Sequence, residues 1–188
     1  MDSKRGDLIE ATKSLLWDIG YESMSPRKVL AKSGAGQGSL YHHFKGKKDL
    51  AAAALGEVET EMRADFDRIF AADKPPLQRL TDYLKLNRNG LKGCRLGRLA
   101  NESSIVDTAL RWPLAAYFRH VEEVVARAVA EAVAAGELDK TARPREIAAA
   151  LVATVQGGYI LSRVHNDPGH VRRATNGAVA MLDALKIP

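Results

Sequence analysis

The stretch SPRKVLAKSGAGQGSLYHHF, residues 25–44, combines a helix start, a glycine turn and a second helix start. Ser25 and Pro26 favour the beginning of a helix, because a serine oxygen can accept an unpaired backbone N–H and proline has no N–H to leave unpaired. Gly34 favours a sharp turn, since glycine adopts positive φ at little cost. The pattern predicts two short helices, over residues 26–32 and 37–44. Two short helices joined by such a turn are typical of a helix-turn-helix that reads DNA.

The second of these helices has an apolar side and an exposed side without acidic residues. Leu40 and Phe44 lie four residues apart on one face and can be buried, which leaves the polar and aromatic residues pointing outward. From Ser23 to Lys48 there is no Asp or Glu, whereas six residues are Lys or Arg. Such a segment suits a polyanion such as DNA. The alternative is a solvated basic face on an ordinary helical domain.

Two kinds of side chain in this region are candidates for DNA contact. Gln, Ser, Tyr and His can reach base edges in the major groove, and the candidates are Gln37, Ser39, Tyr41 and His42. Basic side chains and groups at helix N-termini hold phosphates, and the candidates are Ser25, Arg27, His43, Lys47 and Lys48. Gly36 and Gly38, at the start of the second helix, complete the candidate set.

Residues 7–55 resemble the DNA-binding domain of the tetracycline-repressor-type (TetR) family of bacterial transcription regulators. The residues that carry the resemblance are Ala11, Leu15, Gly20, Tyr21, Ser25, Val29, Ala31, Gly34, Gly38, Ser39, Leu40, Tyr41, His43, Phe44, Lys48 and Leu50. The resemblance implies a dimeric repressor whose N-terminal domains read a palindrome and whose C-terminal domains bind a small molecule. Gly36 stands where the family usually has Ser or Thr, so only its backbone N–H could contact phosphate there.

The rest of the chain is predicted to be helical. The expected helices cover residues 4–19, 47–70, 76–89, 96–103, 108–135, 144–164 and 170–185. We find no convincing strand, so the prediction is an all-α protein of about nine helices. Residues 1–46 are expected to form the helix-turn-helix DNA-binding domain, and residues 47–188 a helical ligand-binding and dimerisation domain.

Charge and cysteine content indicate a DNA-binding protein of the cytoplasm. The net charge is +5, and the first fifty residues, with nine Lys/Arg and six Asp/Glu, hold +3 of it. The lone Cys94 excludes an internal disulfide and a cysteine-cluster zinc site, and it fits a reducing compartment. No apolar run is expected to span a membrane, and the charged N-terminus does not lead into a signal-peptide core. We therefore expect no membrane partner.

The last two expected helices are candidates for a homodimer interface. Apolar and small residues occupy much of the circumference between residues 148 and 158, as in helices that are buried on more than one side. The resemblance implies that this pair meets its symmetry mate in a four-helix interface; the alternative is that it closes the monomer core.

The candidates for contact with a small-molecule effector are aromatic and polar residues of the central helices: Tyr83, Asn87, Trp112, Phe118, Gln156 and Tyr159.

The sequence offers no arrangement typical of an enzyme. The glycines at positions 34, 36 and 38 lack the preceding strand and the spacing of a dinucleotide loop. His165, Asp167 and His170 lack a well-spaced further metal ligand. We therefore expect no catalytic residue, metal or cofactor.

The hypothesis is a ligand-responsive repressor that binds a palindromic operator as a dimer and is released by an effector. The alternatives are a constitutive DNA-binding dimer without effector and an all-helical protein-interaction module.

Overall fold

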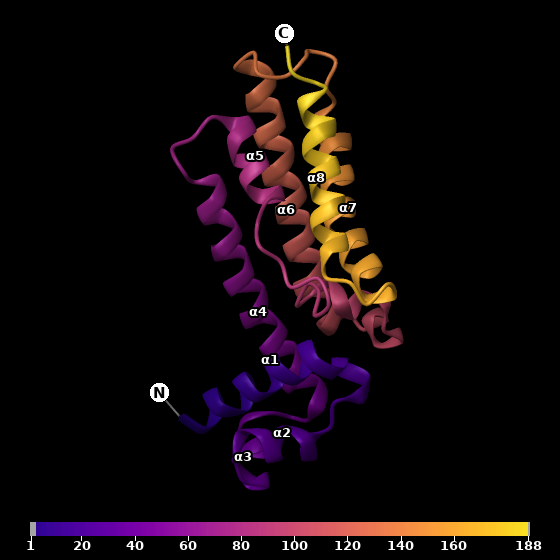
Figure 1. Cartoon of the computed structure of the whole chain (residues 1–188). Helices are drawn as coiled ribbons and strands as arrows, with labels where there is room; N and C mark the ends of the chain where they lie inside the picture. The colour runs from indigo at the N-terminus through magenta and orange to yellow at the C-terminus, as the bar shows by residue number, and fades with distance from the viewer. Residues whose placement is uncertain (1–2, 188) are drawn as a thin grey trace. The chain divides into compact units, whose positions relative to one another are not determined.

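The structure of the chain, a computed structural model, describes residues 3–187 and is all-α, as predicted (Figure 1). Its helices are α1 (Ser3–Ser23), α2 (Pro26–Ser33), α3 (Gln37–His43), α4 (Lys47–Phe70), α5 (Pro76–Leu84), α6 (Thr108–Ala134), α7 (Pro144–Val164) and α8 (Gly169–Asp183). Two short 3-10 helices, η1 (Gly97–Asn101) and η2 (Ser103–Val106), lie between α5 and α6 in the sequence. The described residues form no strand, only one isolated bridge between Leu138 and Lys186.

The chain folds into two compact units. The first contains Met1–Met62 and Arg95–Tyr117, and the second contains Arg63–Cys94 and Phe118–Pro188. Helices α4 and α6 each contribute residues to both units. The first unit therefore includes η1, η2 and the start of α6 as well as the helix-turn-helix. The predicted functional boundary between residues 46 and 47 stays a prediction.

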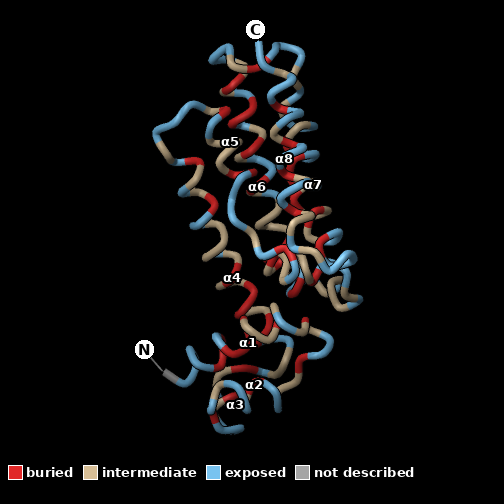
Figure 2. The backbone as a smooth tube through the Cα atoms, in the orientation of Figure 1, coloured by how far each residue is buried: buried red, intermediate tan, exposed pale blue. Residues whose placement is uncertain are grey.

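The first unit is built around the apolar sides of its helices. Leucine side chains from α1, α3 and α4 are almost completely buried: Leu8, Leu16, Leu40, Leu50 and Leu55. The buried positions recur at helical spacing along these helices, shown red in Figure 2. This packing holds α3 by its Leu40 side and leaves the opposite side of that short helix exposed to solvent.

The second unit contains α5, α7, α8 and the remaining parts of α4 and α6. Helices α7 and α8 lie side by side, and Gly158 of α7 allows them to approach closely (Figure 1). A Cβ atom on Gly158 would lie 2.9 Å from the Cα atom of Val171 in α8. Ser162 reinforces the pair, because its buried hydroxyl oxygen accepts a hydrogen bond of 3.0 Å from the backbone N–H of Val171.

The structure departs from the sequence prediction in the region between α5 and α6. The helix predicted over residues 76–89 ends at Leu84, where the Arg88 guanidinium donates hydrogen bonds to the carbonyl oxygens of Tyr83 (2.5 Å) and Leu84 (2.8 Å). These bonds satisfy carbonyl groups that the end of a helix leaves unpaired. The helix predicted over residues 96–103 is instead the pair of 3-10 helices η1 and η2. The described chain therefore has eight α-helices rather than nine.

Helix α7 departs from the prediction that no apolar run reaches the length of a membrane span. It is long and apolar enough to cross a membrane by length and composition alone, with a mean hydropathy of 1.4 over an 18-residue window. This follows from the small and apolar residues around its circumference, and a core helix of a soluble protein passes the same test. About a third of that window, 33%, is buried within the described chain.

Candidate nucleic-acid interface

Helices α2 and α3 begin and end where their capping residues predict. The Ser25 hydroxyl oxygen accepts a hydrogen bond of 3.3 Å from the backbone N–H of Lys28, and Pro26 follows as the first helical residue. Gly34 ends α2 in the left-handed conformation, with φ 66°, and its N–H donates to the Leu30 carbonyl at 3.0 Å. The tight turn between α2 and α3 is confirmed. We call α2, the turn and α3, residues 26–44, the reading head.

The candidate base-reading side chains lie on the exposed side of α3. Leu40 is 0% exposed, whereas the adjacent Tyr41 is 55% exposed. The candidates that are exposed with Tyr41 are Gln37, Gly38 and His42, and those that are partly buried are Ser39 and His43. Gly36 precedes α3 with extended backbone and without a side-chain cap, so its N–H is the group that it offers to a ligand. The exposed side of α3 is thus polar and aromatic, as predicted.

The candidate phosphate-binding residues differ in what they already contact. Arg27 is exposed on α2. The Lys47 ammonium lies 3.4 Å from the carbonyl oxygen of Glu22 and 4.2 Å from the centre of the Tyr21 ring. The Lys48 ammonium donates a 2.9 Å hydrogen bond to the Asp107 carboxylate, which raises the pKa of Lys48. Asp107 is 59 residues further along the chain, so sequence reasoning had no local signal for this pair.

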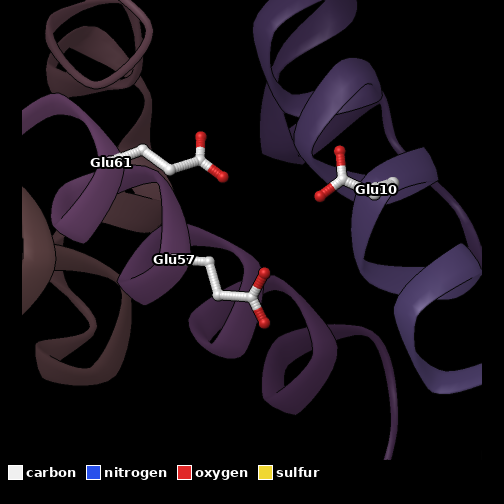
Figure 3. A group of neighbouring side chains, drawn as sticks. All are labelled: Glu10, Glu57 and Glu61. Atoms are coloured by element: carbon white, nitrogen blue, oxygen red, sulfur yellow. The ribbon is translucent and has the colours of Figure 1, made fainter. Parts of the chain in front are cut away.

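Three carboxylates of the first unit gather between α1 and α4. Figure 3 shows the side chains of Glu10, Glu57 and Glu61 pointing toward one another. One carboxylate oxygen of each residue lies within 4.8 Å of those of the other two. The ammonium of Lys13 occupies this cluster: it donates to Glu10 at 2.5 Å and to Glu61, and lies 3.9 Å from Glu57. Burial lowers the pKa of Lys13, but the hydrogen bonds to Glu10 and Glu61 raise it more, so the amine stays protonated. The cluster therefore ties α1 to α4 through a lysine.

The candidate effector residues are divided between the two units. Tyr83 is buried and Tyr159 is partly buried in the second unit, and the Arg88 guanidinium lies 5.1 Å from the centre of the Tyr83 ring. Burial raises the pKa of Tyr83 to about 12, so its phenol is neutral at physiological pH. Phe118 and Gln156 are partly buried in the same unit, whereas Trp112 belongs to the first unit and is 60% exposed.

Asn87, the remaining effector candidate, lines a cavity of about 430 Å³ in the second unit. The cavity lies between the residues that follow α5 and the first turns of α8. Its lining contains three cationic residues and no acidic one: Lys85, Arg88 and Arg172. The guanidinium of Arg88 is engaged by backbone carbonyl groups, which leaves Lys85 and Arg172 as the cations available to a ligand. Sequence reasoning missed both of them, because exposed Lys and Arg carry no local signal of a cavity.

The reading head, together with helices α4 to α8 that follow it in the chain, defines the class of protein as a helix-turn-helix DNA-binding protein. Residues 8–54 match the family model "Bacterial regulatory proteins, tetR family", and residues 76–178 match "Tetracyclin repressor-like, C-terminal domain". The chain belongs to the TetR family of transcriptional regulators.

Similar proteins share this class. The chain is 27% identical over 167 residues to an uncharacterized HTH-type transcriptional regulator of Lactococcus lactis, covering 85% of this chain and 83% of that one. It is 34% identical over 86 residues to the HTH-type transcriptional repressor KstR of Mycobacterium tuberculosis, covering 45% and 39% of the two chains. The crystal structure of the regulatory protein TetR from Rhodobacter sphaeroides superposes with a TM-score of 0.82 at 25% identity, covering 93% and 96%.

Proposed function

We propose that the chain is a ligand-responsive repressor that binds a palindromic operator as a homodimer in the cytoplasm and is released by a small-molecule effector. The observation that carries the DNA-binding part is the exposed polar side of α3, set in a segment without acidic residues from Ser23 to Lys48. Repression is supported by the relative KstR, a repressor by name, whose match covers 45% of this chain.

In the proposed complex, each half-site is read by one α3. Gln37, Ser39, Tyr41 and His42 contact base edges or the groove, whereas Ser25, Arg27, His43, Lys47 and Lys48 contact mainly phosphate, with Gly36 and Gly38 at the helix start. One short helix reads few base pairs, and two-fold symmetry doubles the site. The two copies of α3 then enter successive major grooves roughly 34–36 Å apart.

The proposed dimer interface is the outer side of α7 and α8. Large apolar side chains are exposed there, on α7 and on α8: Ile160 (55%), Leu161 (46%), Val164 (72%) and Met181 (73%). Exposed apolar residues that gather on one pair of helices are typical of a protein–protein contact. A second copy of the same pair would bury them in a four-helix arrangement.

Replacing Val164 with lysine is expected to convert the dimer to a monomer, because it places a charge in an apolar interface. The measurement is the molar mass by light scattering across a range of protein concentrations. The matched control is Val106→Lys, which changes the same residue type at a similarly exposed position (77% against 72%) in the first unit. Equal masses for the two variants would contradict the proposed interface.

The proposed effector site is the cavity beside Asn87. Two available cations, Lys85 and Arg172, and the amide groups of Asn87 and Asn176 suit a small molecule with an anionic group. An effector that binds better to a dimer with another spacing of its reading heads shifts the population away from the operator-binding form.

The test of the proposed function is a selection of bound sequences from random duplex DNA, with the purified chain at physiological salt. The expected result is a palindrome whose half-sites lie about one helical turn apart. Binding without a preferred sequence and with a steep loss in salt would contradict a sequence-specific regulator. A recovered operator then serves as the probe for effectors, whose expected effect is release of that DNA.

A further inference from the structure

Gly20 interrupts α1 with a backbone conformation that strongly favours glycine over residues that carry a side chain. Its φ of 81° lies in the region that side-chain-bearing residues rarely adopt. A Cβ atom built on Gly20 would also overlap the carboxylate of Glu102. Two independent constraints therefore act on Gly20, and the second arises from a residue far along the chain.

At this point of close approach, the carboxylates of Glu102 and Glu22 each accept two hydrogen bonds from the other's segment of the chain. The Glu102 carboxylate accepts from the backbone N–H groups of Tyr21 (3.1 Å) and Glu22 (2.8 Å). The Glu22 carboxylate accepts from the Ser103 hydroxyl (2.6 Å) and the Ser104 backbone N–H (3.1 Å). The Ser103 hydrogen bond, followed by that of Ser104, holds the pKa of Glu22 below its usual range. The end of α1, which leads into the reading head, is thus held by residues 102–107, which we call the clamp segment.

The clamp segment also holds Lys48 at the start of α4. One oxygen of Asp107 accepts from the backbone N–H of Ala109 at 2.9 Å and caps the first turn of α6. The other oxygen accepts from the Lys48 ammonium at 2.9 Å. The Lys48 side chain is 60% exposed, so a phosphate can reach it from solvent. An exposed ion pair is weak and screened by salt, and a phosphate can replace the carboxylate.

We propose that Asp107 competes with an operator phosphate for Lys48, so that the clamp segment regulates DNA binding while it positions the reading head. The inference rests on the proposed DNA-binding function. Asp107 caps a helix whose later residues, from Phe118 to Ala134, belong to the second unit. A change in the first turn of α6 that moves the Asp107 carboxylate would alter how strongly Lys48 is withheld from DNA.

The test measures operator affinity against salt concentration for the full chain and for Asp107→Asn, Lys48→Gln and the double variant. The Asp107→Asn substitution keeps an oxygen that can cap α6 but removes the charge that holds Lys48. We expect Asp107→Asn to raise operator affinity several-fold, and Lys48→Gln to reduce the slope of log K against log salt by about 1.8, the value for one phosphate contact in each of the two half-sites. In the double variant, the gain in affinity from the loss of the Asp107 charge is expected to shrink to that of a carboxylate that does not contact Lys48.

The double variant separates direct competition from a general effect of charge. Removing any carboxylate near DNA raises affinity through the long-range field. Asp49→Asn is the matched control because Asp49 is next to Lys48 at the start of α4, but its carboxylate accepts from the backbone N–H of Lys45 instead. The increase in operator affinity caused by Asp49→Asn is expected to persist when Lys48→Gln is also present. If the Asp107→Asn gain persists there undiminished, or if Asp107→Asn has no effect, the competition is wrong. A wild-type chain that binds no duplex DNA would instead contradict the proposed function itself.

A second measurement tests the positioning role of the clamp segment in the free protein. Glu102→Gln replaces one of the two acceptor oxygens by an N–H₂ group, so hydrogen exchange is expected to accelerate about tenfold at the Tyr21 or the Glu22 amide, whichever loses its acceptor. The amide of Ala11, in the middle of α1, is the internal control. Unchanged exchange at both clamped amides would overturn this role.

Discussion

Replacing Leu40 with alanine is expected to lower the free energy of unfolding of the first unit by about 2–5 kcal/mol and to abolish operator binding. Leu40 is 0% exposed, so the substitution leaves a void where α3 packs on its neighbours. The measurement is equilibrium denaturation in urea, followed by circular dichroism, together with operator binding by fluorescence anisotropy. An unchanged midpoint of denaturation would show that α3 is not held by this side chain.

The adjacent residue provides the matched comparison. Tyr41 lies on the same helix but is 55% exposed, so Tyr41→Ala is expected to change the free energy of unfolding by less than about 0.5 kcal/mol. Operator affinity is nevertheless expected to fall by about tenfold or more, because a base contact contributes about 1–3 kcal/mol of discrimination. The two variants thus separate the residue that holds α3 from a residue proposed to read DNA. Normal operator affinity in Tyr41→Ala would remove Tyr41 from the proposed contacts.

Replacing Gly158 with valine is expected to lower the free energy of unfolding of the second unit by about 3 kcal/mol. The new Cβ atom would lie 2.9 Å from the Cα atom and 3.2 Å from the Cγ2 atom of Val171. Because a backbone atom of α8 cannot rotate away, the two helices must separate or shift. The measurement is thermal and urea denaturation, with light scattering to follow the proposed dimer, which uses the same helices.

Gly157 is the control for this substitution. It lies in the same helix, but a Cβ atom on Gly157 would meet nothing within 4 Å in the chain. Gly157→Ala is expected to stabilise α7 by about 0.5–1 kcal/mol, since alanine favours a helix over glycine. A loss of stability in Gly157→Ala as large as that in Gly158→Val would contradict close packing at Gly158 as the cause.

Local residue chemistry determined the helix-turn-helix from the sequence alone. The Ser25 cap, the Gly34 turn and the four-residue spacing of Leu40 and Phe44 act within one or two helical turns, so their effect is visible in a short stretch. The same kind of signal predicted most helix ends and the exposed side of α3. It overestimated the helix after Pro76, because Arg88 satisfies the last carbonyl groups of α5 from outside any helical pattern.

Only the tertiary structure decided which charged and polar residues meet. Lys13 with Glu61, Glu102 with the backbone at Tyr21, and Lys48 with Asp107 join positions 48, 81 and 59 residues apart. Such contacts follow no helical periodicity in the sequence and are not marked by neighbouring residues, because they depend on which helix faces come together when the apolar sides are buried. Gly20 illustrates this difference. Its residue type alone predicts the break in α1, whereas only the folded chain shows that the Glu102 carboxylate fills the space beside it.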